Sequence, residues 1–315
     1  MLIDSINLNN DIMNIYKYEE VLCKKDVYIC FDSNLKKNIK ETEVPTDYYH
    51  FSFLQNEDFS NFKEDVIIDE AFVCLYQWCF NYQHFLTECL PKVFAFLHMK
   101  KYKENLKIII PNISWIEDFF LVFCNKNDIL KNSHNLKIKK AYFASDKNRN
   151  MLTIDSFFYM MRDCVSIHYD FNEKKENIYF KRISSNFNVV NGRNIFNEEE
   201  FENFILKNNY KISSFEDKDI FKKLNILSKI KNAIFINGAG MMNFCFCNNN
   251  INLVIVNHPG FFVDTKWIDQ IYLNKNINYK IFNIENIENI NISSNDSIKI
   301  NINQFKTFLN LYKFI

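Results

Sequence analysis

The chain has 315 residues, and 48% of them are hydrophobic, which is enough to fill two separate cores. Lys and Arg together number 38, as do Asp and Glu, so the formal net charge is zero. A neutral chain argues against non-specific binding of nucleic acid, because contacts to phosphates need a surplus of cations.

The 9 cysteines form no CxxC pair, and most of them lie in apolar runs. This pattern favours buried thiols in a reducing compartment over a disulfide framework, and we expect no metal site. The N-terminus lacks the basic and apolar segments of a secretory signal, and every apolar stretch is broken before membrane-spanning length. We therefore expect a soluble, cytoplasmic protein without a transmembrane segment.

Strand-like and helix-like apolar runs alternate in the first half of the chain. Strands are predicted over 26–32, 66–68 and 106–110, and a helix over 114–124. Asn81 can cap a further helix that starts at Tyr82. Pro91 falls inside that helix and should kink it, because proline has no backbone N–H to donate. The alternation predicts a parallel sheet covered on both faces.

The same alternation restarts after a polar, charged stretch over 169–177. Strands are predicted over 178–181, 210–215, 233–237 and 253–257, and helices over 197–208, over 218–231 and from Ala239. Asn197 and Glu200 have the spacing of a capping box. This order is that of a mononucleotide-binding half of a doubly wound fold. The Asn-rich stretch over 283–303 reflects a compositional bias and carries little functional signal.

These elements predict an α/β chain of two Rossmann-like domains facing a cleft, which is the architecture of the glycosyltransferase B class. We expect an N-terminal, acceptor-side domain over 1–172 and a nucleotide-sugar-binding domain over 173–300. A C-terminal helix over 301–315 could pack back on the first domain. Fold alone does not determine function, so the candidate sites must support any functional prediction.

A glycine-containing turn is the sharpest local signal in the chain. Only 4 glycines occur, and two of them, Gly238 and Gly240, flank Ala239 directly after an apolar strand. Such a turn could direct bare backbone N–H groups and the start of a helix toward a diphosphate. Asn243 could donate an amide to a nucleotide. Alternatively, the corner needs glycine only for close packing, and the turn alone does not decide between the two interpretations.

Three segments, in this order, resemble motifs of glycosyltransferase family 61. The segment NYQHFLTECLP at 81–91 looks like that family's NYYHWLxExLPR segment, and YFKR at 179–182 is similar to its Y-x-x-R strand. Arg193 and Asn197-Glu198 are similar to the R-x-x-x-N-E further along, and NGAGMMN at 237–243 resembles the HGAGLTN type of motif. The resemblance implies a two-domain fold, an inverting mechanism and no metal requirement.

The chain departs from the family pattern at two places near the turn. Asn237 stands where the family has a histidine, and Val256 or Asn257 stands where an acidic residue would hold the ribose. The second departure leaves the identity of the nucleotide open.

His84 and Glu88 are four residues apart and therefore share one face of the predicted helix. Inverting sugar transfer needs one base on the acceptor hydroxyl while the bond to the anomeric carbon forms. Given the resemblance, we assign Glu88 as the base, with His84 as an alternative base or an orienting group. Without the resemblance, a surface His–Glu pair would be the better interpretation.

Arg182 ends the first strand of the second domain, where open α/β sheets place their ligands. Its guanidinium suits a phosphate leaving group and would stand in for a metal ion. Lys181 and Arg193 are weaker candidates for the same task. His258 could touch the nucleotide, although a loop histidine is usually solvated. The predicted substrate-binding residues are Lys181, Arg182, Arg193, Asn237, Gly238, Ala239, Gly240, Asn243 and His258.

The sequence thus predicts an inverting, metal-independent glycosyltransferase that uses a nucleotide-sugar donor as co-substrate and a hydroxyl of a glycan as acceptor. No bound cofactor and no nucleic-acid partner are expected, and the oligomeric state is left open. A catalytically silent nucleotide- or glycan-binding protein on the same fold is the alternative. A nucleotide-binding oxidoreductase is disfavoured, because GAGMMN lacks a third glycine and no acidic residue ends the next strand.

Overall fold

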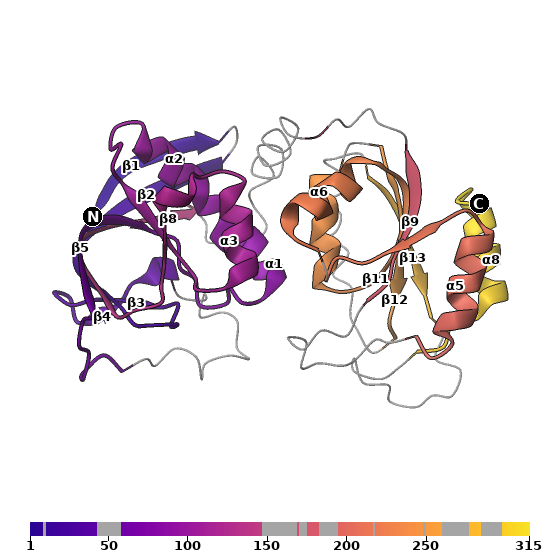
Figure 1. Ribbon diagram of the computed structural model, residues 1–315, viewed down its shortest axis with the longest axis horizontal. Coiled ribbons are helices and arrows are strands. Elements are labelled where there is room, and N and C mark those ends of the chain that lie inside the picture. The colour runs from indigo at the N-terminus through magenta and orange to yellow at the C-terminus, as the bar shows by residue number, and fades with distance from the viewer. Residues whose placement is uncertain are drawn as a thin grey trace. The chain divides into compact units, whose positions relative to one another are not determined.

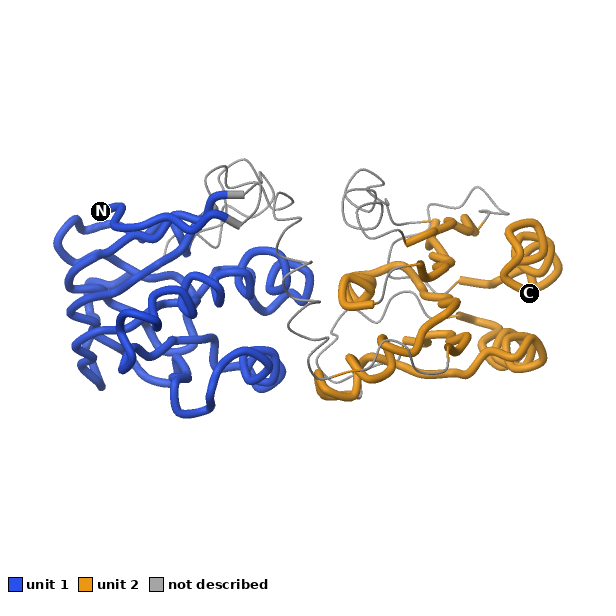
Figure 2. The backbone as a smooth tube through the Cα atoms, turned by 90° about the horizontal axis from the view of Figure 1, so that it is seen from above, with its two compact units in different colours: residues 1–157 blue, residues 158–315 orange. Residues whose placement is uncertain are grey.

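The structure is a computed structural model of the chain. It describes residues 1–8, 11–42, 58–146, 169, 175–182, 195–216, 218–247, 250–259, 277–284 and 298–315. The chain divides into two compact units, unit 1 over Met1–Phe157 and unit 2 over Phe158–Ile315 (Figure 2). This division lies before the boundary predicted at residue 172. No helix in the described part is long and apolar enough to span a membrane.

Unit 1 is built on a mixed sheet whose described strands have the order β4-β3-β2-β8-β5-β6-β7, with β1 paired to β2. The strands β5, β6, β7 and β8 pair in parallel, whereas β1, β2, β3 and β4 pair antiparallel, as does β2 with β8. The bounds are β1 Leu2–Leu8, β2 Asp11–Cys23, β3 Cys30–Asp32, β4 Lys37–Asn38, β5 Val66–Val73, β6 Lys107–Ile110, β7 Ile129–Lys131 and β8 Leu136–Asp146.

The purely parallel sheet predicted for this half is therefore wrong. Its antiparallel part is centred on β2, in which Met13, Ile15, Val21 and Cys23 are buried and the residues next to each of them are partly buried or exposed. The predicted strand over 26–32 shortens to β3, because Asp26 lies in a turn with a left-handed backbone (φ of 55°) and the strand begins only at Cys30.

The helix predicted from Tyr82 exists, but it changes type along its length. Asn81 caps it as predicted, since the side-chain oxygen accepts from the Gln83 N–H at 3.0 Å. The segments are α1 Tyr82–His84, a π-helical turn Phe85–Cys89, a 3₁₀ turn Leu90–Lys92 and α2 Val93–Lys100. The other helical segments in the described part of unit 1 are α3 Ser114–Leu121 and the 3₁₀ turns Lys40–Thr42 and Lys126–Asp128.

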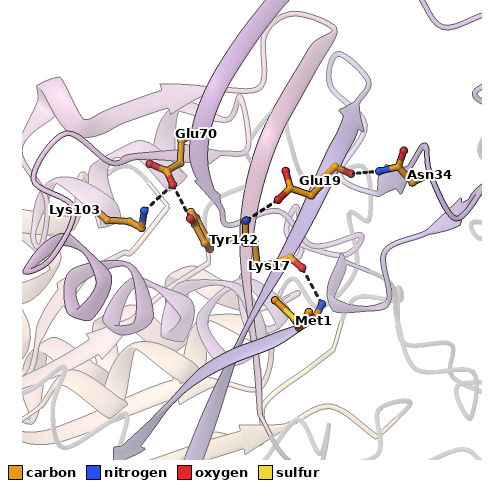
Figure 3. Close-up of polar contacts among 7 residues, drawn as sticks. All are labelled: Met1, Lys17, Glu19, Asn34, Glu70, Lys103 and Tyr142. Atoms are coloured by element: carbon orange, nitrogen blue, oxygen red, sulfur yellow. Dashed lines mark hydrogen bonds and ion pairs between the residues drawn. The ribbon is translucent and has the colours of Figure 1, made fainter.

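Polar contacts connect the strands of unit 1 to the chain around them (Figure 3). The Glu70 carboxylate on β5 accepts from Lys103, which lies just after α2, at 2.7 Å and from Tyr142 on β8 at 2.6 Å. Burial alone would raise the pKa of Glu70, but these two hydrogen bonds lower it below its ordinary value. Lys17 and Glu19 on β2 form a further ion pair at 2.6 Å. Glu70 therefore joins two strands and the end of α2.

Unit 2 is built on a parallel sheet of five described strands in the order β10-β9-β11-β12-β13. The bounds are β9 Glu176–Phe180, β10 Lys211–Ser213, β11 Ile230–Ile236, β12 Asn252–Asn257 and β13 Asn278–Asn283. If these five strands are numbered 1 to 5 in chain order, their order across the sheet is 2-1-3-4-5. The direction of winding therefore reverses between β9 and β11. The doubly wound sheet predicted for this half is confirmed. Ligands of such sheets bind at the carboxyl ends of the two strands that flank this switch point.

Helices cover both faces of the unit 2 sheet (Figure 1). One face carries α5 Glu198–Lys207 and α8 Ile302–Leu311, and the other carries α6 Ile220–Ser228 and the 3₁₀ helix η6 Ala239–Phe246. Successive residues of β9 point to opposite faces of the sheet. The Tyr179 ring packs on Phe201 of α5, with 5.2 Å between ring centroids, and the Phe180 ring packs on Phe244 of η6, with 5.6 Å between centroids.

The C-terminal helix, predicted as a candidate to pack on the first domain, instead packs in the core of unit 2. Phe305 of α8 contacts the rings of Phe201 and Phe282 at 5.2 and 4.9 Å. The Tyr210 hydroxyl donates to the Phe314 carbonyl at 3.1 Å. Apolar residues spaced along one side of α8 explain this placement, because the sheet and α5 offer them a continuous core.

Asn197 precedes α5 as predicted, but the capping box does not form. Its side-chain oxygen accepts from the Ile300 N–H, and its amide donates to the Ile300 carbonyl and to Glu200, each at 2.9–3.0 Å. Asn197 therefore ties the start of α5 to the segment that leads into α8.

The Phe305→Ala substitution tests the place of α8 in the core. We expect it to lower the opening free energy of unit 2 by about 3–5 kcal/mol, because it empties a buried ring site. The measurement is native-state hydrogen exchange of the β11 and β12 amides. Leu311→Ala, at a residue 70% exposed, is the control and should stay within about 0.5 kcal/mol. Equal effects of the two changes would contradict the placement.

Candidate functional site

His84 and Glu88 form a hydrogen-bonded pair in unit 1. The distance from His84 Nδ1 to Glu88 Oε1 is 2.8 Å, and the two side chains are 16% and 10% exposed. The predicted pairing on one face of the helix is thus seen in the structure. An ionised carboxylate can only accept hydrogen bonds, so Nδ1–H of His84 donates to ionised Glu88, and in the neutral imidazole Nε2 then carries the lone pair. The pair offers two acceptor atoms for a proton, Glu88 Oε2 and His84 Nε2.

The backbone beneath this pair is set by Asn81 and Pro91. Asn81 caps the first turn, and Pro91 has no N–H for a regular α-helical bond. The Leu90 N–H bonds to the Phe85 carbonyl, five residues back, and so closes a π turn that contains Glu88. Such single π turns are frequent at functional sites. At Pro91, where a kink was predicted, the helix continues as the 3₁₀ turn Leu90–Lys92, directly after the π turn that contains Glu88.

Two residues close in sequence to this pair were not predicted as part of a site. The Trp78 ring packs at an angle against the His84 ring, with 4.5 Å between the ring centroids. Lys92 is buried, and its ammonium donates to the Glu41 carbonyl at 2.7 Å and lies 5.4 Å from the centre of the Tyr76 ring. In the sequence, only their closeness to the segment 81–91 points to these two residues. Lys92 contacts a residue distant in the chain, and Trp78 lies in a loop.

Arg182 lies just beyond β9 at the carboxyl end of the unit 2 sheet. Phe180 pairs with Phe235 in the register, so Arg182 and Asn237 both lie two residues beyond one pair of neighbouring strands. The Arg182 Nη1 nitrogen is buried and has no hydrogen-bond partner among the residues that the structure describes. Burial lowers the pKa of the guanidinium, and the nearby Glu216 carboxylate opposes that shift. Arginine stays charged, so this site holds a desolvated cation at the switch point.

Lys181 and Arg193 were the weaker candidates for binding phosphate. The Lys181 ammonium pairs with Glu202 of α5 at 2.8 Å, and this hydrogen bond raises the pKa of the lysine. Lys181 is therefore committed to a protein carboxylate, which makes it less available to a ligand than Arg182. Arg193 lies outside the described residues.

The glycine corner comes directly after β11, next to Arg182 in the sheet. Gly238 has an extended backbone, with φ of 165° and ψ of 179°, which any residue can adopt. Gly240 differs, because a Cβ atom there would lie 3.0 Å from Cζ of Phe235. Close packing therefore explains Gly240, while the backbone conformation does not explain Gly238. Ala239 and Gly240 are partly exposed and begin the 3₁₀ helix η6, whose first N–H groups have no partner within the helix.

Asn237, Asn243 and His258 were predicted to contact a nucleotide, and all three side chains are buried. The Asn237 amide donates to the Asn257 side-chain oxygen at 3.1 Å, and the Asn243 amide donates to the Gly240 carbonyl at 2.7 Å. Both asparagines thus hold the corner from within the protein. For His258 the alternative of a solvated loop histidine is excluded, because it comes immediately after a buried strand and is itself buried, and its predicted contact with the nucleotide stays a prediction.

The cysteines and possible metal ligands were also predicted from the sequence. The eight cysteines in the described ranges are free and buried, as predicted, and Cys164 lies outside those ranges. No group of three or more His, Cys, Asp or Glu side chains in the same ranges could hold a metal ion.

The comparison with protein-family models gives one match. The model described as Glycosyltransferase 61 matches residues 82–254, which is more than half of the chain. The matched range contains the His84–Glu88 pair, Arg182 and the glycine corner. No curated protein matches the chain.

The Gly240→Ala substitution tests the packing explanation for this glycine. The added Cβ would press on the Phe235 ring, so we expect the opening free energy at β11 to fall by about 1–3 kcal/mol. The measurement is hydrogen exchange of the β11 amides. Combined with Phe235→Leu, which removes the ring, Gly240→Ala should cost clearly less than it does alone. Strict additivity of the two changes would show that the ring is not the obstacle.

Proposed function

Because the chain belongs to glycosyltransferase family 61 and is a glycosyltransferase, we propose that it uses a nucleoside-diphosphate sugar as donor and a glycan hydroxyl as acceptor. We propose further that it inverts the anomeric centre and needs no metal ion. The observation that carries the proposal is Arg182, whose Nη1 atom is buried and has no hydrogen-bond partner among the described residues, at the same edge of the sheet as the glycine corner.

The donor diphosphate is assigned to the carboxyl ends of β9 and β11. There, Nη1 of Arg182, which has no partner within the described ranges, provides a charged donor. The start of η6 at Ala239 provides backbone N–H groups. A guanidinium binds phosphate oxygens through two parallel hydrogen bonds, and it keeps its charge throughout the reaction. Negative charge grows on the departing diphosphate, so Arg182 supplies the stabilisation that a divalent ion would otherwise provide.

The proton acceptor is assigned to the His84–Glu88 pair. The acceptor hydroxyl oxygen attacks the anomeric carbon, the bond from that carbon to the diphosphate oxygen breaks, and its electron pair leaves with the diphosphate. The hydroxyl proton passes to Glu88, and we assign it to Oε2, because Oε1 accepts from His84. His84 then orients the carboxylate, while proton transfer to His84 Nε2 is the alternative.

We assign the base to unit 1 and the diphosphate site to unit 2, as the sequence-based expectation of a glycosyltransferase B fold implies. Donor binding and proton abstraction should therefore respond to different substitutions.

Glu88→Gln should lower kcat by about 10²- to 10⁴-fold, because the amide keeps the shape but takes up no proton. Binding of the donor's nucleoside diphosphate should stay within about twofold, since Glu88 belongs to the acceptor side of the proposal. The measurement combines initial rates with calorimetric titration. His84→Asn is the matched variant and should reduce kcat less than Glu88→Gln does. The reverse order would assign the base to His84, and wild-type turnover in both variants would remove the pair from catalysis.

Arg182→Ala should weaken binding of the nucleoside diphosphate about 10- to 100-fold, because charge-assisted hydrogen bonds are lost. It should also lower kcat, since the charge on the leaving group grows in the transition state. Lys181→Ala is the control on the neighbouring cation, which already pairs with Glu202. Unchanged affinity in the Arg182 variant would count against the donor site.

A further inference from the structure

Two rows of asparagine side chains cross the parallel sheet of unit 2. The amino row lies near the start of the strands: Asn232 donates to Asn177 at 3.0 Å, Asn252 donates to Asn232 at 2.8 Å, and Asn278 donates to Asn252 at 3.0 Å. Each bond joins neighbouring strands, so the row connects β9, β11, β12 and β13.

The carboxyl row lies at the opposite end of the same strands. Asn237 donates to Asn257 at 3.1 Å, and Asn257 donates to Asn283 at 3.0 Å, which joins the ends of β11, β12 and β13. The register explains both rows, because in-register parallel strands set like positions side by side. Side-chain amides stacked in this way form ladders of hydrogen bonds.

The carboxyl row differs from the amino row because it leads directly into the glycine corner. Asn237 immediately precedes Gly238, and its backbone N–H bonds to the Val256 carbonyl at 2.9 Å. The side-chain bond to Asn257 therefore continues the pairing of β11 with β12 up to that corner. Glycine loses more conformational freedom on ordering than any other residue, so a corner with Gly238 and Gly240 needs anchoring at its flanks.

The other flank of the corner is anchored in the same manner. Asn243 donates to the Gly240 carbonyl at 2.7 Å, and the Met241 N–H donates to the Gly238 carbonyl at 3.0 Å. Hydrogen bonds within η6 thus hold the residues after the corner, and the carboxyl row holds Asn237 before it. A preorganised corner binds a ligand more tightly, because less ordering remains to be done on binding.

We propose that Asn257, supported by Asn283, is a positioning residue for the donor. It acts through Asn237, whose fixed side chain holds the glycine corner in the form that receives the diphosphate. This inference rests on the proposed function, because it assigns the corner to the donor.

The amino row provides the comparison that separates positioning from simple stabilisation. Asn252 and Asn257 lie at the two ends of β12, both are partly exposed, and each takes part in two bonds of its row. Replacing either one by leucine, which has a similar shape and no amide, removes two ladder bonds from the same sheet. The two variants should therefore lose similar stability, while only Asn257→Leu should alter the conformation of the glycine corner.

The experiment measures binding of UDP, GDP, ADP and dTDP to the full chain by calorimetric titration. For the nucleotide that binds the wild type best, Asn257→Leu should raise Kd about tenfold, the equivalent of about one lost hydrogen bond. Asn252→Leu should stay within about twofold. In steady-state assays the donor KM should rise for Asn257→Leu, while the acceptor KM stays unchanged.

Equal Kd values for the Asn257 and Asn252 variants would overturn the inference. If Arg182→Ala weakens binding in the same series, the donor site itself stands and only the positioning role is lost. Wild-type affinity in the Arg182 variant, or no binding of any of the four nucleotides, would remove the donor site and the inference with it.

A second matched pair covers the case in which Asn257→Leu fails to fold. Asn283 and Asn278 are both exposed on β13 and end the carboxyl row and the amino row, respectively. Asn283→Leu should raise Kd measurably, by less than a change at Asn257 would, and Asn278→Leu should leave Kd unchanged. An Asn283 variant with wild-type Kd would contradict the support that we assign to this residue.

Discussion

The parallel, in-register pairing of β9 with β11 is the constraint on which the proposed donor site depends. Because Phe180 pairs with Phe235, the residues just beyond the two strands, Arg182 and Asn237, reach the same edge of the sheet. Neither residue is near the other in sequence. The winding order then reverses at this pair of strands, so no helix connects their carboxyl ends directly. A buried cation and a glycine corner thus become neighbours through backbone pairing alone.

Unit 1 builds its candidate base by a different route, from short-range constraints within one segment. Asn81 fixes where the helix starts, and Pro91 prevents a regular continuation, so the π turn falls between them and carries Glu88. The hydrogen bond to His84 then holds the carboxylate in one orientation. The cost of an irregular helix is offset by packing, since Phe85 on the same turn is fully buried.

Local signals in the sequence predicted the elements well, and non-local ones did not. The helix start at Asn81, the irregular helix around Pro91 and the doubly wound order of unit 2 depend on neighbours in sequence or on regular spacing, and the structure shows all three. The antiparallel strand β2 was missed, because its partner β8 lies more than a hundred residues away in the sequence. Asn243 and His258 were interpreted as ligand contacts, because a sequence does not show whether a polar side chain turns inward.

The asparagine rows show how a compositional bias can become structure. The stretch over 283–303 was interpreted as bias without functional signal, yet Asn283 ends the carboxyl row. In a chain rich in asparagine, this residue occurs at several strand ends. Where parallel strands pair in register, asparagines at equivalent positions lie side by side and form hydrogen bonds to each other. Asn237 is one position at which the chain departs from the family pattern, and Asn257 is one of the two candidates, with Val256, for the other; the structure bonds Asn237 to Asn257. This bond joins neighbouring strands through neutral amides, directly before the glycine corner, where the family pattern has a histidine.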